Sequence, residues 1–230
     1  MGIDKFLKED LKMLLGFKKP IIANINGSAI NEYAQIAKKL ESEEKIVALE
    51  INISCPNVKQ GGMSFGVDPI MAFEVVKAVR KASSKFLIAK LTPNVTDIVV
   101  IGKATVKAGA DAISAINTVS GIAIDIHNCR PKLGNITGGL SGPAIKPIGI
   151  KAVYSLYKAN LGVPIIGIGG ITGADDALEY IIAGASAVQI GTASFTDEAI
   201  FTKTVDGIEK YMLQHGFSKI NMLRGSLNLP

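Results

Sequence analysis

The chain has 230 residues, of which 48% are hydrophobic and 20% are charged. This length and composition suit one domain with a continuous apolar core, and they exclude a disordered tail, a collagen-like repeat and a disulfide scaffold. Two cysteines are too few for a disulfide framework and indicate a reducing compartment. Because no apolar stretch reaches the ~18 residues of a spanning helix and no signal peptide is recognisable, we expect a cytoplasmic protein without a membrane partner.

The net charge of +5 raises the question of nucleic-acid binding. The lysines are scattered at spacings typical of solvated helix faces, tryptophan is absent, and only 6% of the residues are aromatic. A basic stripe interleaved with aromatic side chains is therefore missing, and we expect no nucleic-acid partner. His127 and His215 lie far apart and lack metal-ligand spacing, so we expect no metal site.

Six short runs of mostly apolar, often β-branched residues predict β-strands at 20–25, 46–53, 86–91, 112–117, 163–168 and 187–190. Their near-continuous apolar character is typical of strands that are covered on both faces. Between them lie amphipathic stretches, with helix starts predicted at Asp68-Pro69, Thr96-Asp97 and Thr196-Asp197-Glu198. This alternation predicts one α/β domain with a parallel sheet, either a barrel or a doubly wound sheet.

One connection is unusually long. The Gly-rich segment 120–142 falls in the gap between the fourth and fifth predicted strands. Since long loops in compact domains are usually functional, we expect a lid or a binding loop here.

Polar residues or glycines end every predicted strand. In a parallel α/β fold the site lies at the carboxyl ends of the strands, so these residues are the candidates for it. In chain order they are Asn24, Asn52 with Cys55, Lys90, Asn117 with Thr118, Gly169 with Gly170, and Gly191 with Thr192.

The segment Gly167–Gly173 resembles a dinucleotide fingerprint but departs from it, because Thr172 stands where the third glycine is required. Paired with Gly191-Thr192 one strand–helix unit later, its backbone N–H groups would form a phosphate cradle. The alternative is that these glycines only make tight turns.

Two further residues carry candidate chemistry. Cys55 follows a strand and precedes a proline and a glycine pair, a polar context that favours a reactive thiol over a buried apolar cysteine. Cys129 has no predicted strand beside it and is expected to be an incidental surface thiol. Lys90 lies in an apolar strand, where its charge requires either an anionic ligand or a side chain that extends to the strand end.

Taken together, these residues resemble class 1 dihydroorotate dehydrogenases. The resemblance runs over nearly the whole chain and favours the NAD-linked 1B catalytic subunit, because of Val58–Gly62 and Asn94–Asp97. It implies a TIM (β/α)8 barrel, spanning residues 1–230 as a single domain, that binds FMN at its carboxyl face. The motifs that carry it are Leu49–Asn57, Lys90–Asp97, Ala115–Thr118, Asn135–Pro143, Ile166–Gly170 and Gln189–Thr192.

The resemblance also implies roles for single residues. Cys55 would be the catalytic base, and Asn52, Asn57, Asn117 and Thr118 would bind the substrate. The flavin contacts would be Asn24, Asn52, Lys90, Ile116, Gly142, Gly169, Gly170, Gly191 and Thr192.

The implied reaction oxidises dihydroorotate to orotate in pyrimidine (UMP) biosynthesis. Electrons would leave the FMN through a partner subunit carrying FAD and a 2Fe-2S cluster and pass to NAD, within a heterotetramer built on a homodimer. Two cysteines cannot ligate such a cluster with four thiolates, so the cluster would belong to the partner.

The chain departs from the family pattern at its start, because Gly2–Leu7 resembles the region before the third barrel strand. Six of eight barrel strands are recognisable, so we expect an N-terminally incomplete barrel. Two alternatives follow for the function. One is an inactive barrel fragment that binds a phosphate ligand, and the other is a domain like that of dihydropyrimidine dehydrogenases, which has a related barrel and loop cysteine.

Overall fold

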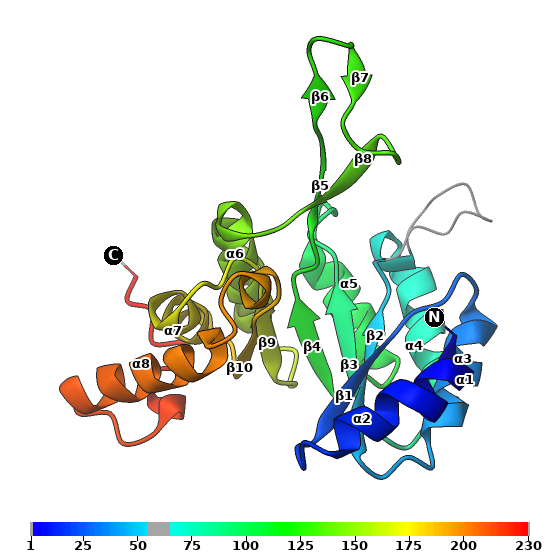
Figure 1. The fold of residues 1–230 in the computed structure, drawn as a ribbon. Helices are drawn as coiled ribbons and strands as arrows, with labels where there is room; N and C mark the ends of the chain where they lie inside the picture. Colours follow the sequence, from blue (N-terminus) through cyan, green and yellow to red (C-terminus); the bar gives the residue numbers. More distant parts are fainter. Residues whose placement is uncertain (1, 55–64, 230) are drawn as a thin grey trace. The chain divides into compact units, whose positions relative to one another are not determined.

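A computed structural model describes residues 2–54 and 65–229 of the chain. They form two compact units (Figure 1). The first unit runs to Leu91 and includes Val100–Ile113, and the second comprises Thr92–Val99 and the chain from Ser114 onward. The sequence predicts that residues 1–230 form one domain. Whether the two units combine into such a domain stays a prediction.

The first unit alternates strands and helices along one parallel sheet. Its strands follow the order β1-β2-β3-β4. Three helical turns precede the sheet, and α3 and α4 pack against each other beside it. The elements are α1 (Ile3–Lys5), η1 (Phe6–Asp10), α2 (Leu11–Leu15), β1 (Ile21–Ile25), α3 (Ile30–Leu40), β2 (Ile46–Asn52), η3 (Phe65–Val67), α4 (Pro69–Ala82), β3 (Phe86–Leu91), α5 (Ile98–Lys107) and β4 (Ala112–Ala115).

The second unit continues from β4 with the strand order β4-β9-β10. Helices α6 and α7 pack on β9, and α8 packs on α7. The elements are β5 (Val119–Ile122), β6 (Ile124–Asp125), β7 (Arg130–Pro131), β8 (Thr137–Leu140), η4 (Pro143–Ile145), α6 (Lys146–Lys158), β9 (Ile165–Ile168), α7 (Ala174–Ala183), β10 (Ala187–Gln189), η5 (Thr192–Phe195), α8 (Ile200–Gln214) and η6 (Ile220–Met222).

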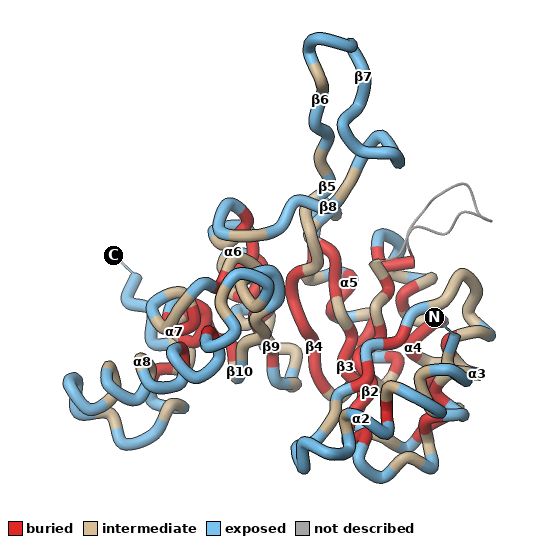
Figure 2. The backbone as a smooth tube through the Cα atoms, viewed as in Figure 1, coloured by how far each residue is buried: buried red, intermediate tan, exposed pale blue. Residues whose placement is uncertain are grey.

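All six predicted strands are confirmed: β3 has the predicted bounds, and the other five are one or two residues shorter. The fifth begins at Ile165 rather than Val163, because Pro164 lacks the N–H that a sheet ladder needs. Most residues of β2 and β3 and all of β4 are buried (Figure 2), which explains their continuous apolar runs. The helix starts predicted at Asp68-Pro69 and Thr96-Asp97 are confirmed, whereas the third helix, α8, begins later than predicted, at Ile200 with Ala199 as its N-cap. Asp68 caps α4 by accepting the Ile70 N–H at 2.7 Å, and Asp97 accepts the Val99 N–H at 2.8 Å before α5.

The Gly-rich segment folds as an antiparallel ribbon, and its expected role as a lid or a binding loop stays a prediction. Strand β5 pairs with β8 and β6 pairs with β7, so that Val119–Leu140 folds back on itself. This β5–β8 ribbon extends away from the helices of its own unit, and its residues are mostly exposed (Figures 1 and 2). Cys129 lies exposed at its tip, as a surface thiol should, although β7 begins directly after it.

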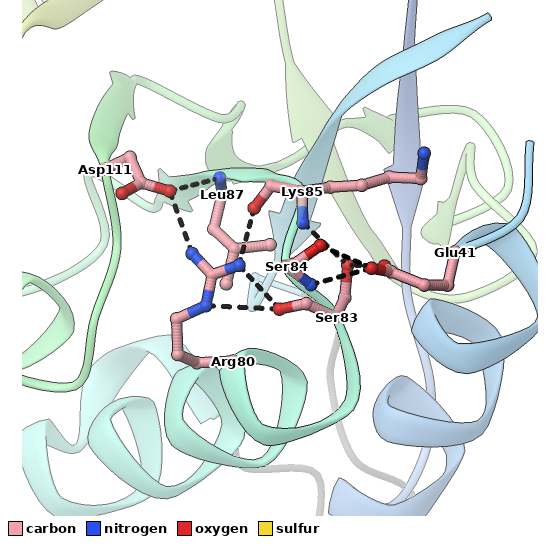
Figure 3. A network of polar contacts seen from close by, with 7 residues as sticks. All are labelled: Glu41, Arg80, Ser83, Ser84, Lys85, Leu87 and Asp111. Carbon is pink, nitrogen blue, oxygen red and sulfur yellow. Dashed lines mark hydrogen bonds and ion pairs between the residues drawn. The ribbon is translucent and has the colours of Figure 1, made fainter. Parts of the chain in front are cut away.

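A polar network lies at the amino-terminal ends of β3 and β4 (Figure 3). The Arg80 guanidinium at the end of α4 donates to the backbone oxygens of Ser83 and Lys85 and forms an ion pair of 3.0 Å with Asp111. Asp111 also accepts the Leu87 N–H at 2.8 Å. One arginine therefore joins the end of α4 to the starts of both strands.

Glu41 at the end of α3 completes this network. Its carboxylate accepts hydrogen bonds from the Ser83 hydroxyl at 2.5 Å, the Ser84 hydroxyl at 2.6 Å and the Ser84 N–H at 3.0 Å. These bonds from Ser83 and Ser84 lower the pKa of Glu41 to about 2. The carboxylate thus stays charged and connects α3 to the α4–β3 turn.

We expect Arg80→Ala to lower the free energy of unfolding by about 2 kcal/mol, because hydrogen bonds to a charged group are lost from three acceptors at once. Urea denaturation followed by circular dichroism measures this change. Lys81→Ala is the matched control, since Lys81 is exposed beside Arg80 and its removal should change stability by no more than about 0.5 kcal/mol. Equal midpoints for the two variants would contradict the bridging role of Arg80.

Candidate active site

Three polar residues lie at the carboxyl edge of the sheet in the first unit. Asn52 on β2 is the direct register partner of Lys90 on β3. Asn24 on β1 stands opposite Glu50, two residues before Asn52. Neighbouring parallel strands therefore place Asn24, Asn52 and Lys90 at one edge of the sheet.

Asn24 is held by a buried carboxylate. Its Nδ2 donates to Glu50 Oε2 at 2.6 Å, and Glu50 is only 5% exposed. Because a buried carboxylate is costly without hydrogen-bond donors, this contact ties the amide to the sheet. The sequence analysis missed Glu50. An acidic residue within an otherwise apolar strand is the pattern that could have identified it.

Helix α3 fixes the end of β2. The hydroxyl of Tyr33, which is fully buried, donates to the Asn52 backbone oxygen at 2.8 Å, and the Tyr33 ring packs edge-on against Phe65 with centroids 6.0 Å apart. Asn52 Oδ1 accepts the Ser54 N–H at 3.2 Å. The chain is therefore firmly positioned up to Ser54, directly before Cys55.

Lys90 has only intermediate exposure on an otherwise buried strand. Its ammonium forms neither an ion pair nor a hydrogen bond with any residue in the described ranges. An ammonium near apolar surroundings, with no counter-ion among the residues that the structure describes, favours binding of a negatively charged ligand.

In the second unit, two glycine segments lie side by side. Gly169-Gly170 follows β9 and Gly191-Thr192 follows β10, and these strands pair through Ile168 and Gln189. Gly170 has φ +68°, and a Cβ atom there would come within 2.9 Å of the Gly142 oxygen and the Lys146 nitrogen. Only glycine fits this position.

The other flavin contacts that are expected in the second unit are Ile116, Gly142 and Thr192, and they lie near these glycines. The Ile116 Cγ1 atom would lie 3.4 Å from a Cβ atom at Gly169, and Thr192 Oγ1 donates to Ser141 Oγ at 2.9 Å, next to Gly142. Within the described residues, the backbone N–H groups of Gly170 and Gly191 donate to no protein acceptor. These N–H groups are free to bind an anion.

Helix α7 supports this glycine turn through Tyr180. Its hydroxyl donates to the backbone oxygens of Gly169 at 2.7 Å and Ile168 at 3.1 Å, and burial raises its pKa. Sequence reasoning missed Tyr180, because an aromatic residue on a helix between apolar neighbours indicates only a core position.

Asp176 fixes the next residues of the turn. It accepts the Thr172 N–H and hydroxyl, both at 2.7 Å, and pairs with Lys146 at 2.7 Å. Burial opposes its ionisation, but the hydrogen bonds from Lys146 and Thr172 lower its pKa. The carboxylate therefore holds the turn and the start of α6 together.

Asn117 and Thr118 follow β4 in the same unit. Asn117 Oδ1 accepts the Thr118 N–H at 2.7 Å. The structure thus describes all the expected site residues except two, since Cys55 and Asn57 lie outside the described residues.

The sequence profile of the family described as "Dihydroorotate dehydrogenase" matches residues 1–212. The catalytic subunit of dihydroorotate dehydrogenase B (NAD(+)) from Geotalea daltonii is 52% identical over 229 residues, covering 100% of this chain and 75% of that protein. Its counterpart from Pelobacter propionicus is 51% identical over 227 residues, covering 99% of this chain and 74% of that protein.

The chain belongs to the dihydroorotate dehydrogenase family. The relatives that are about 50% identical to it are named as the catalytic subunit of the NAD-linked B class. The word "subunit" in that name implies a further subunit.

A solved structure supports the fold of this chain. The enzyme from Eimeria tenella, crystallised with ferulenol, superposes with a TM-score of 0.71 at 24% identity. The match covers 88% of this chain and 58% of that chain. Six parallel strands with crossover helices are thus part of the TIM-barrel fold, as the sequence predicts. No helix in the described ranges is long and apolar enough to span a membrane.

Proposed function

We propose that this chain is the catalytic subunit of an NAD-linked dihydroorotate dehydrogenase, which oxidises dihydroorotate to orotate for pyrimidine biosynthesis with FMN as its cofactor. The observation that carries the proposal is the identity of 52% to a class B catalytic subunit over 229 residues. The geometry of the described residues is consistent with it in each unit.

The residues present fit FMN. A phosphate group accepts hydrogen bonds from backbone N–H groups, and Gly170 and Gly191 offer two that have no protein acceptor among the described residues. Gly142, Gly169 and Thr192 would complete this phosphate cradle, with Ile116 beside Gly169. Asn24, Asn52 and Lys90 would contact the flavin ring.

In the proposed reaction, the thiolate of Cys55 accepts the proton from C5 of dihydroorotate. When bound, FMN would supply the acceptor for the hydride at C6, and loss of this hydride and of the C5 proton would leave the C5=C6 double bond of orotate. A thiolate suits the role of base because its pKa can be lowered toward neutrality. The Lys90 ammonium would offset the negative charge that accompanies reduction of the flavin.

Amide side chains would orient the substrate. Asn52, Asn57 and Asn117 each both donate and accept hydrogen bonds, which matches the alternating N–H and C=O groups of a pyrimidine. Thr118 adds a hydroxyl at the same end of β4.

The two electrons would leave through a partner subunit that carries FAD and a 2Fe-2S cluster, and would reach NAD there. We place the chain as a homodimer within a heterotetramer in the cytoplasm. The chain has two cysteines, too few to hold such a cluster with four thiolates.

The function is tested by flavin binding and reduction in the purified chain. We expect FMN to bind with micromolar or tighter affinity, and dihydroorotate to bleach its visible absorbance under anaerobic conditions while dihydrouracil does not. Bleaching by dihydrouracil alone would favour a dihydropyrimidine dehydrogenase-like domain. FMN binding without bleaching by either compound would instead favour an inactive barrel fragment.

A further inference from the structure

The segment after β4 carries two of the proposed substrate residues, and it is held by residues that the proposed function does not use. Thr118 is followed directly by β5, the first strand of the β5–β8 ribbon. The position of Thr118 therefore depends on what fixes residues 118–120, the root of that ribbon.

Asn94, in the loop between β3 and α5, contacts this root on both sides of Val119. Its Nδ2 donates to the Thr118 backbone oxygen at 3.0 Å, and its Oδ1 accepts the Ser120 N–H at 2.9 Å. Its Nδ2 also donates to Thr92 Oγ1 at 2.9 Å, which orients the amide. Only a side chain that both donates and accepts can make this pair of contacts.

Gly139 on β8 confines Thr118 in a second way. It pairs with Ser120 in the β5–β8 ladder. A Cβ atom at Gly139 would overlap Thr118 Oγ1 and would lie 2.7 Å from Thr118 Cβ. Any larger residue at position 139 would therefore displace the Thr118 side chain.

We infer that Asn94 and Gly139 are positioning residues for the pyrimidine substrate, because Asn94 bonds the Thr118 backbone and Gly139 packs against the Thr118 side chain. The inference rests on the proposed function, in which Asn117 and Thr118 bind dihydroorotate and orotate. It assigns to the root of the ribbon a role in substrate affinity that is separate from FMN binding.

The test compares Asn94→Asp, Asn94→Ala and Gly139→Ala in the FMN-loaded chain. We expect each variant to raise the Kd for orotate, measured from the shift of the flavin spectrum, by about tenfold, since small displacements of positioned groups are costly. The KM for dihydroorotate should rise similarly, whereas the Kd for FMN should stay within about threefold. Asn128→Ala and Gly134→Ala are matched controls, because Asn128 contacts only Asp125 among the described residues and a Cβ at Gly134 meets nothing within 4 Å.

A readout on the flavin-free chain separates the two contacts of Asn94. Asn94→Ala should accelerate hydrogen exchange at the Ser120 amide, whereas Asn94→Asp keeps the acceptor and should preserve protection there while still weakening orotate binding. Unchanged orotate affinity in the three variants would overturn the inference, as would an equal loss of FMN affinity. A parent chain that binds FMN but not orotate would instead overturn the proposed function, and the substrate role of Asn94 with it.

Discussion

Cys55→Ser is expected to lower the kcat for dihydroorotate at pH 7 by about 100- to 10,000-fold, the range lost with a general base. A serine hydroxyl is far less acidic than a thiol, so almost none of it is ionised at neutral pH. The loss should diminish as the pH rises. Steady-state assays across pH, together with the rate of flavin bleaching, measure both effects.

The matched control for Cys55→Ser is Cys129→Ser, which removes the exposed thiol at the tip of the β5–β8 ribbon. We expect this control to keep full activity. Both variants should retain FMN, since neither residue is assigned to the flavin contacts. Full turnover by Cys55→Ser at neutral pH would disprove the role of Cys55 as base.

Gly170→Ala is expected to weaken FMN binding by about 100-fold or more. Gly170 lies in the left-handed region at φ +68°, which costs a non-glycine residue about 1–2 kcal/mol. Its new methyl group would also meet Lys146 Cβ at 2.8 Å and the Gly142 oxygen at 2.9 Å. The turn must then shift and misplace the N–H groups that would bind the phosphate. Fluorescence titration of FMN measures the change.

Gly162→Ala is the control that separates the effect of backbone strain from the effect of disrupting the phosphate cradle. Gly162 has φ +77°, yet a Cβ atom there meets nothing within 4 Å. We therefore expect Gly162→Ala to lower stability through backbone strain alone and to leave FMN affinity unchanged. If Gly162→Ala and Gly170→Ala weaken FMN binding equally, the cradle is not where the phosphate binds.

The parallel strands could be predicted from sequence because each is a local apolar run, and burial on both faces leaves a pattern within a few residues. The β5–β8 ribbon could not. Its pairing partners, such as Val119 and Leu140, lie far apart in sequence, and its glycines and polar residues have the composition of a loop.

The residues of the candidate site likewise divide into those that the sequence predicts and those that it does not. Residues at or just after the carboxyl end of a strand, such as Lys90 within β3 and Gly170 after β9, were predictable because chain direction alone places them at the carboxyl edge of the sheet. The residues that hold them, such as Tyr33 and Tyr180, act through contacts to backbone oxygens on other elements. No periodicity in the sequence records such a contact.

The β5–β8 ribbon also bears on how the second unit folds. Strand β9 joins β4 only after the chain between Ala115 and Ile165 has closed into a loop, and a longer loop costs more entropy to close. Because Val119 pairs with Leu140, the ribbon removes its own length from that loop once its hairpin has formed. Hairpins form within microseconds, so we expect the nonlocal pairing of β4 with β9 to be reached through a shorter effective connection. Residues added at the ribbon tip would leave that connection unchanged.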